Sequence, residues 1–555
     1  MPTKAARNHP FALQNQAFYR STSSLCLLAL AACWSPSANK ESADEQVYSI
    51  LDEVAQKVSG TTTAERPKFA VERPVDTLRE KLVATKQPVN LSLAQALDVA
   101  AENSRDFQRQ KEQLYLAALS LTRSQHDFAW RFGGGGEGEV SGESDTSADA
   151  RLGNDLGASA TSVAGTRVVA SFVNTFLRSV ISGGSFDGSS ILNLTLTQPL
   201  LSGAGRRIVR EPLTQSERDV IYAMRSFERF RADFAVTIVS DYWNVAAQMA
   251  DLVNVEANYR TLRQSREQIE ELFDAGRRTI TDLGRAKQSE FSADAQRVAA
   301  KNRLQGALDR FKLTLGLPIT AQLELDPKEI EKLNAQGVSE VTLTENSALD
   351  LALQRRLDHR TVIDEVEDAG RRIYVAEDAL TMALDFTAAL NVPAESGKGL
   401  NLDWSRVNWS AGFQLDLALD KLAERNAYRG ALISFDQAVR SREESEDQVG
   451  AGVRTSLRNI QSAIDSFRIQ TVAVELAGQR VEATTDLYDA GRVDALEKLD
   501  AQDALLQAQL ELTAAIVDYS IARLQLMNDL EAIALQPAGL RFDQSLPIPQ
   551  AKAAE

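Results

Sequence analysis

The chain has 555 residues, of which 44% are hydrophobic and 25% are charged, and its formal net charge is −16. This composition excludes an intrinsically disordered chain and a polytopic helical membrane protein. The acidic excess argues against nucleic acid as a partner, because phosphate binding requires a basic surface. The length suits two to four ordinary domains or one large elongated domain.

Residues that usually carry chemistry are few and scattered. The chain has two cysteines, Cys26 and Cys33, and three histidines, His9, His126 and His359. Their spacing builds neither a disulfide framework nor a zinc site. No nucleophile elbow, Walker phosphate-binding loop or HExxH motif occurs. We therefore expect no enzymatic activity, no cofactor and no metal.

Residues 1–32 have the character of an export signal. Their only formal charges are three cations, and the apolar run Leu25–Ala32 is too short to span a bilayer. The ending LAAC resembles the lipobox of bacterial lipoproteins, which implies that Cys33 becomes the acylated first residue. An ordinary signal peptide cut near Ala32 is the alternative. A single acylated cysteine would anchor the chain to a membrane without spanning it.

The segment 33–88 is predicted to be an N-terminal linker with one short helix. Its other residues are largely polar and suit a linker. The helix is indicated by apolar residues at helical spacing, namely Val47, Ile50, Leu51, Val54 and Val58.

One short phrase occurs twice in the chain. LFDAGRRTI begins at Leu272 and LYDAGRVDA begins at Leu487, an offset of 215 residues. The starts of the two halves also match, with ALDVA at Ala96 and ALDLA at Ala348. The same offset of 215 aligns Ala286 with Ala501, Phe291 with Leu506 and Ala293 with Ala508. Agreement at separate places indicates an internal duplication.

The duplication sets the predicted domain boundaries. The first repeat covers residues 89–325 and the second covers residues 340–536. A linker, 326–339, joins them, and a tail, 537–555, follows. Each repeat is expected to contain a helix, a strand pair, a long helix and a helical hairpin.

Each repeat contains an unusually long helical pattern. From Leu213 to Ala275 there are 63 residues without Gly or Pro, and apolar residues recur at steps of three and four. Such a helix would be roughly 95 Å long, far beyond a helix of an ordinary globular domain. The second repeat has the same steps, but bends are expected there at four glycines, Gly430, Gly450, Gly452 and Gly478.

The repeated Asp-Ala-Gly-Arg phrase lies where each long helix should end. Gly276 and Gly491 permit the left-handed turn that ends a helix, and a second Ala-rich helix follows each. Arg277 and Arg492 would lie beside a helix C-terminus, whose dipole favours cations. These four residues either cap the helices or form hairpin tips that dock against a partner.

Other stretches alternate apolar and polar residues with period two. The clearest are Leu192–Thr197, Leu384–Val392 and Trp409–Leu417, and a first strand is expected near Phe128–Phe132. Between this strand and the next, residues 133–205 hold fourteen of the thirty glycines. We expect an oversized loop there at the outer surface, in which Thr166–Phe176 could add a short strand.

Four alternating strands per chain have a consequence for assembly. One polar and one apolar face suit a barrel with lipid outside and water inside. Two hairpins cannot close a barrel, and unpaired strand edges are prohibitive in lipid. Several chains must therefore share one barrel.

At this point the sequence resembles the TolC-like family of outer-membrane efflux channels, over roughly residues 89–536. The resemblance is carried by the duplicated Leu-x-x-Ala-Leu starts, the strand-to-helix turn Gln198–Arg206 and the two Ala-Gly-Arg tips. It departs from the family where Asn103-Ser104-Arg105 and Leu357-Asp358-His359 replace the usual Asn-Asn-Pro.

The resemblance implies a mainly α fold with a transmembrane β-barrel. Three chains would give four strands each to one 12-stranded barrel, and their coiled-coil helices would form an α-barrel in the periplasm. The tips would meet a periplasmic adaptor joined to an inner-membrane transporter. Family members often place acidic residues at the closed end of the tunnel, and the candidates here are Asp274, Asp282, Asp489 and Asp494.

Function is therefore expected to be passive transport. The leading hypothesis is a lipid-anchored outer-membrane exit duct of a tripartite efflux or type I secretion system, gated at the periplasmic helical tips. A non-conducting coiled-coil protein that spans the envelope is the alternative, and an enzyme is the third possibility. The alternation at Trp409–Leu417 counts against the non-conducting coiled-coil protein, because such a protein would need no lipid-facing strands.

Overall fold

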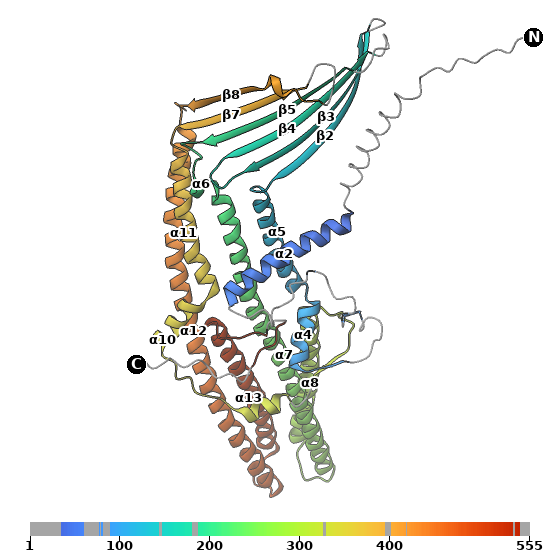
Figure 1. Ribbon diagram of the computed structural model, residues 1–555. Coiled ribbons are helices and arrows are strands. Elements are labelled where there is room, and N and C mark those ends of the chain that lie inside the picture. Colours follow the sequence, from blue (N-terminus) through green and yellow to red (C-terminus); the bar gives the residue numbers. More distant parts are fainter. Residues whose placement is uncertain are drawn as a thin grey trace, which may run out of the picture.

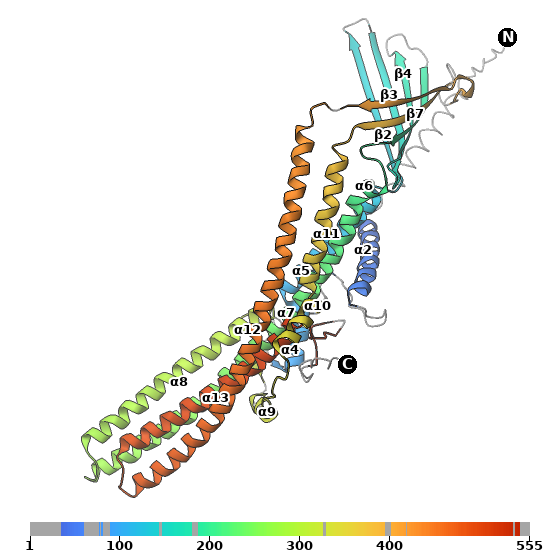
Figure 2. The ribbon, with the colours of Figure 1, turned by 90° about the vertical axis from the view of Figure 1, so that its left-hand side faces the viewer.

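The computed structural model describes residues 35–59, 71, 77, 79–80, 89–143, 147–179, 187–325, 329–394, 401–417, 419–536 and 539–543. The predicted signal peptide and Cys33 lie outside these ranges. The molecule is elongated. A β-sheet forms one end, long helices lead away from it, and two helical hairpins form the other end (Figure 1 and Figure 2).

The sheet at one end has six antiparallel strands in the order β2-β3-β4-β5-β7-β8. Its register places apolar residues on one face, as in the row Ala170, Leu194, Leu390 and Trp409. The next row, on the other face, is polar and contains Ser171, Asn193, Asn391 and Asn408. The strands are Arg131–Glu143 (β2), Ser147–Thr161 (β3), Arg167–Ser179 (β4), Asp187–Pro199 (β5), Ala383–Pro393 (β7) and Asn408–Asp416 (β8).

The prediction of four strands and a large loop is wrong. Most of the glycine-rich segment forms strands β2, β3 and β4, and every residue of β2 has a register partner in β3. A glycine has no side chain that could show alternation, so the period-two pattern is lost although the backbone still pairs. The expected short strand at Thr166–Phe176 coincides with β4, which begins one residue later, at Arg167. Three copies of this sheet would therefore supply more than the twelve strands expected.

The long helices are present as predicted. α7 (Glu211–Asp274) has 64 residues and α12 (Leu422–Asp489) has 68. α12 continues as one helix through its four glycines, and its axis bends between its upper and lower parts (Figure 2). The other helices are α4 (Leu93–Asn103), α5 (Arg105–His126), α6 (Arg206–Val209), α8 (Ile280–Thr314), α9 (Glu329–Gln336), α10 (Glu345–Arg355), α11 (Leu357–Asp378) and α13 (Ala495–Asp529).

The order of elements is similar in the two halves. Two helices precede strands, then a long helix and a returning helix follow, in both α4–α8 and α10–α13. Two short parallel strands, β1 (Val89–Leu91) and β6 (Leu323–Leu325), pair with each other and so join the beginning of the first half to its end. In the part of the chain that the structure describes, no helix has both the length and the apolar character needed to cross a bilayer.

The main core lies at mid-height, around α7. Tyr242 of α7 is fully buried and donates a 3.4 Å hydrogen bond to the carbonyl oxygen of Leu91. The predicted N-terminal helix is α2 (Pro36–Ser59), and its Val47 and Leu51 are fully buried in this core. The hydroxyl of Tyr115 on α5 donates to Asp44 of α2 at 2.7 Å. α2 is thus packed onto the body of the protein.

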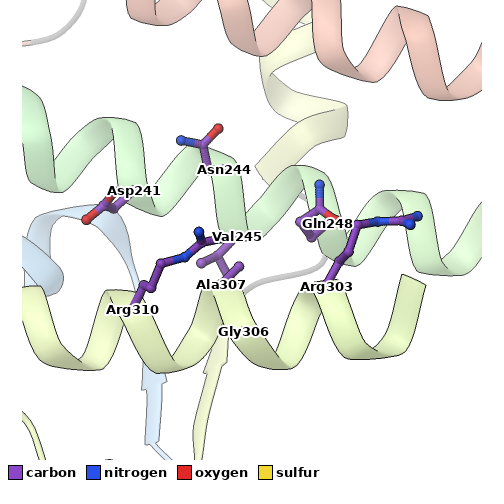
Figure 3. A pocket seen from close by; sticks show the side chains of 8 residues that line it. All are labelled: Asp241, Asn244, Val245, Gln248, Arg303, Gly306, Ala307 and Arg310. Carbon is purple, nitrogen blue, oxygen red and sulfur yellow. The ribbon is translucent and has the colours of Figure 1, made fainter. Parts of the chain in front are cut away.

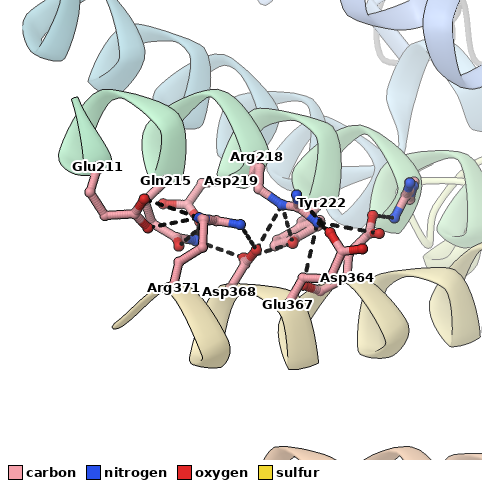
Figure 4. Close-up of polar contacts among 10 residues, drawn as sticks. Glu211, Gln215, Arg218, Asp219, Tyr222, Asp364, Glu367, Asp368 and Arg371 are labelled. Atoms are coloured by element: carbon pink, nitrogen blue, oxygen red, sulfur yellow. Dashed lines mark hydrogen bonds and ion pairs between the residues drawn. The ribbon is translucent and has the colours of Figure 1, made fainter. Parts of the chain in front are cut away.

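An ion-pair network joins α7 to α11 (Figure 4). Asp368 of α11 is only 3% exposed and accepts from Tyr222 at 2.7 Å. It also pairs with Arg218 at 2.7 Å and Arg371 at 2.8 Å. Arg371 reaches Glu211 at 2.9 Å. The network holds together two helices that come from different halves of the sequence.

Candidate functional site

The two hairpin tips have the same backbone geometry. Gly276 and Gly491 both have φ +71°, the left-handed conformation expected of them. The N–H of Arg277 donates to the carbonyl of Leu272 at 2.8 Å, and the N–H of Arg492 donates to Leu487 at 2.9 Å. Each glycine also donates to the carbonyl three residues earlier. This is the Schellman arrangement that satisfies the last carbonyls of a helix.

The four candidate acids have two kinds of surroundings. Asp274 and Asp489 are exposed and end α7 and α12. Asp282 accepts from the hydroxyl of Thr279 at 2.8 Å and from its N–H at 3.1 Å, which closes a capping box at the start of α8 and lowers the pKa of Asp282. Asp494 caps α13 by accepting from the N–H of Glu497 at 3.3 Å. Two of the four acids therefore stabilise helix starts.

Contacts between the hairpins centre on Tyr488 at the end of α12. Its side chain is 5% exposed, and this burial raises its pKa. The guanidinium of Arg278, from the first tip, lies 4.4 Å from the ring centroid, and the ammonium of Lys498 lies 4.9 Å from it. Arg285 of α8 also pairs with Asp494 at 3.7 Å. One tip is thereby attached to the other.

An apolar cluster supports these polar contacts. It joins side chains of both hairpins, including Ile269, Leu283, Tyr488 and Leu499. Buried alanines recur every seven residues along α8, and each has a buried alanine in α13 that lies 215 residues later. Heptad spacing of small residues allows helices to pack closely with left-handed crossing. The pairs are Ala286 and Ala501, Ala293 and Ala508, Ala300 and Ala515, and Ala307 and Ala522.

A polar groove of about 720 Å³ lies farther from the tips, between α7 and α8 (Figure 3). Asp241, Asn244 and Gln248 line it from α7, and Arg303 and Arg310 line it from α8. Burial raises the pKa of Asp241, although Thr314 donates to its carboxylate at 2.9 Å. The groove holds no nucleophile paired with a base. Among the described residues, no cluster of histidine, cysteine or acidic side chains could hold a metal.

Sequence reasoning found the tips but missed the residues that join them. Gly276, Arg277, Gly491 and Arg492 lie at the hairpin ends, and all four are exposed. Arg278, Arg285, Tyr488 and Lys498 were not singled out. The contacts of Arg278 with Tyr488 and of Arg285 with Asp494 cross between segments about 210 residues apart, and no local pattern encodes such a contact. The aromatic residue before Asp-Ala-Gly-Arg was the one available signal, because it occurs in both copies of the phrase.

Comparisons with known proteins agree with this geometry. Residues 348–530 match the family described as outer membrane efflux protein. The chain is 23% identical over 380 residues to outer membrane protein TolC of Escherichia coli, covering 64% of this chain and 73% of TolC. It is 25% identical over 349 residues to the alkaline protease secretion protein AprF of Pseudomonas aeruginosa, covering 60% of this chain and 68% of AprF.

Solved structures with the same fold include two outer-membrane channels. OprN has a TM-score of 0.58 at 16% identity, covering 85% of this chain and 97% of OprN. CmeC of Campylobacter jejuni has a TM-score of 0.59 at 14% identity, covering 87% of this chain and 96% of CmeC. At these identities the structures establish the fold alone. The family match and the alignments to TolC and AprF confirm that the chain resembles the TolC-like family of outer membrane efflux proteins.

Proposed function

We propose that the chain is the outer-membrane exit duct of a tripartite efflux or type I secretion system. The observation that carries this proposal is the combination of a two-faced antiparallel sheet with helices of 64 and 68 residues leading away from it. The sheet suits a wall between lipid and water, and the helices suit a conduit through the periplasm. The match to the outer membrane efflux protein family and the similarity to TolC support a transport protein rather than an enzyme.

The duct requires more than one chain. The six-stranded sheet has two free edges, which would be prohibitive in lipid. The family resemblance implies a homotrimer that binds a periplasmic adaptor joined to an inner-membrane transporter. Acylation of Cys33 would add an anchor in the outer membrane.

Gating follows from the contacts between the tips. Arg278 beside Tyr488 and the Arg285–Asp494 ion pair hold the second hairpin against the first, and Lys498 of the second hairpin lies beside the same ring. A cation over a partly buried ring contributes about 1 kcal/mol, and a half-exposed ion pair contributes less than about 1 kcal/mol. These energies are small enough for a binding partner to overcome.

The adaptor would bind at the exposed tips and favour their separated arrangement. Gly276, Arg277, Gly491 and Arg492 present backbone and cations at the end of the molecule. A partner shifts this equilibrium only by the difference between its affinities for the open and closed tips. No bond is made or broken, and selectivity would come from the width and charge of the bore.

Two measurements test the proposal. Light scattering of the purified protein in detergent should give the mass of three chains, and insertion into planar bilayers should give discrete ion currents. A monodisperse folded monomer would contradict the shared barrel. A trimer that inserts but never conducts, even with tips opened by substitution, would favour the non-conducting coiled-coil alternative.

A further inference from the structure

The sheet ends in two strands that pair on one side only. β2 pairs with β3, β8 pairs with β7, and the described residues supply neither with a second partner. Six is an even number of antiparallel strands, so β2 and β8 run in opposite directions. The β8 edge of one copy can therefore pair antiparallel with the β2 edge of the next. A head-to-tail contact of this kind repeats around a ring until it closes.

The faces of the two edge strands also match. Large apolar side chains of both point to the same face of the sheet and are exposed in the single chain. Phe132 of β2 is 81% exposed, and Trp409 and Phe413 of β8 are 76% and 71% exposed. The register of the sheet places these three residues on one face, which is also the face of Leu194 and Leu390. Pairing the edges would continue this apolar face from one copy to the next.

One alignment of the edges satisfies both charge and shape. Both strands adjoin the helical body, β2 at Arg131 and β8 at Asp416. Placing Arg131 opposite Asp416 brings unlike charges together at this end. On the apolar face, the same alignment sets Phe413 and Trp409 opposite glycines, a pairing that stabilises glycine-rich edges. The resulting pairs are Phe132 with Leu415, Gly134 with Phe413, Gly136 with Ala411 and Gly138 with Trp409.

We propose that β2 of one copy pairs with β8 of the next, so that three copies close a barrel of 18 strands (3 × 6). This inference rests on the proposed function, because it takes three copies in a membrane as given. It differs from the twelve strands that the family resemblance implies. The β3–β4 hairpin then forms part of the wall, where sequence reasoning placed a loop.

The added strands widen the outer part of the duct. With strands about 4.8 Å apart and tilted by about 40°, the backbone diameter grows from roughly 24 Å for twelve strands to roughly 36 Å for eighteen. Side chains occupy about 5 Å on each side, so the free bore grows from roughly 14 Å to roughly 26 Å. The outer mouth would admit folded segments that a twelve-stranded mouth excludes.

Disulfide cross-linking tests the pairing directly. In F132C/L415C the two cysteines should join neighbouring copies, and oxidised protein should run as trimers on a denaturing gel without reductant. The matched control is F386C/F413C, because Phe386 and Phe413 are register partners within one chain. Its disulfide should form inside each monomer and should not change the oligomer on the gel. Each single-cysteine variant shows the background from native cysteines.

The competing arrangement has its own cysteine pair. If β2 and β3 folded away from the wall, β4 would become the edge and V168C/L415C would cross-link copies instead. That result, or the absence of cross-linking in F132C/L415C from a conducting trimer, would overturn the 18-stranded barrel and leave the proposed function intact. Failure of both pairs in a protein that is neither trimeric nor conducting would overturn the proposed function as well.

Polymer exclusion gives an independent measure of width. Neutral polymers added only on the outer side of a planar bilayer reduce the current when they enter the mouth. Polymers about 20 Å across should enter an 18-stranded mouth and be excluded from a twelve-stranded one. Exclusion of these polymers from the outer side would contradict the wide barrel, whatever the cross-linking shows.

Discussion

Replacing Arg278 with alanine should open the periplasmic end. The guanidinium lies 4.4 Å from the ring centroid of Tyr488, which is 5% exposed, so the contact is partly shielded from water. Its loss should cost the closed tip about 1 kcal/mol per chain, since Lys498 stays beside the ring. If three chains open together, the total is about 3 kcal/mol, and the ratio of open to closed states should rise about a hundredfold.

Single-channel recording without adaptor measures this ratio as the fraction of time spent open. The neighbouring Arg277 offers a matched control, because its side chain is exposed at the same tip. R277A should leave the open fraction measured without adaptor unchanged. It should weaken only the export that depends on adaptor binding. Equal open fractions in R278A and R277A would refute the idea that the Tyr488 contact holds the tips closed.

Three other variants give further checks. G276V with G491V should weaken export but not membrane insertion, because a branched residue at φ +71° costs about 1–2 kcal/mol or more; the helical G284V is the control, and normal export by the double variant would show that the tips are not critical. D368A should lower the thermal midpoint through a loss of about 1.5–3 kcal/mol, since it removes the buried carboxylate shared by Tyr222, Arg218 and Arg371, although both arginines keep a glutamate partner; an unchanged midpoint would contradict this. Burial raises the pKa of Asp251 to about 6, so the wild type should lose stability relative to D251N as the pH rises through 6. Thermal midpoints at pH 4 and pH 8 measure this difference, and a constant gap between the two proteins would exclude it.

Much of the helical architecture could be predicted from the sequence. A helix of 64 residues was indicated because the stretch lacks Gly and Pro and keeps its apolar steps throughout. The ends of both long helices were indicated by Gly276 and Gly491, because a left-handed residue after a helix is a local requirement. The alternation of apolar and polar side chains indicated the two faces of β7 and β8. This signal is also local, because successive residues of a strand point to opposite faces.

The sheet near the N-terminus was predicted poorly. β2 carries six glycines, and a strand of glycines has no face that a pattern could reveal. Its strand form depends on β3 lying beside it and accepting its backbone hydrogen bonds. Thus the pattern of residues could not predict the number of strands in the sheet, and so it could not predict the width of the proposed barrel.

The sequence by itself determined where the long helices end, where the hairpin tips lie and which side chains of β5, β7 and β8 share a face. Each of these depends on residues within one or two helical turns or along one strand. Only the tertiary structure decided that the glycine-rich segment joins the sheet and that Arg278 meets Tyr488. It also decided that Asp368 joins α7 to α11. Those features depend on backbone pairing and on contacts between distant segments, which the local order of residues does not encode.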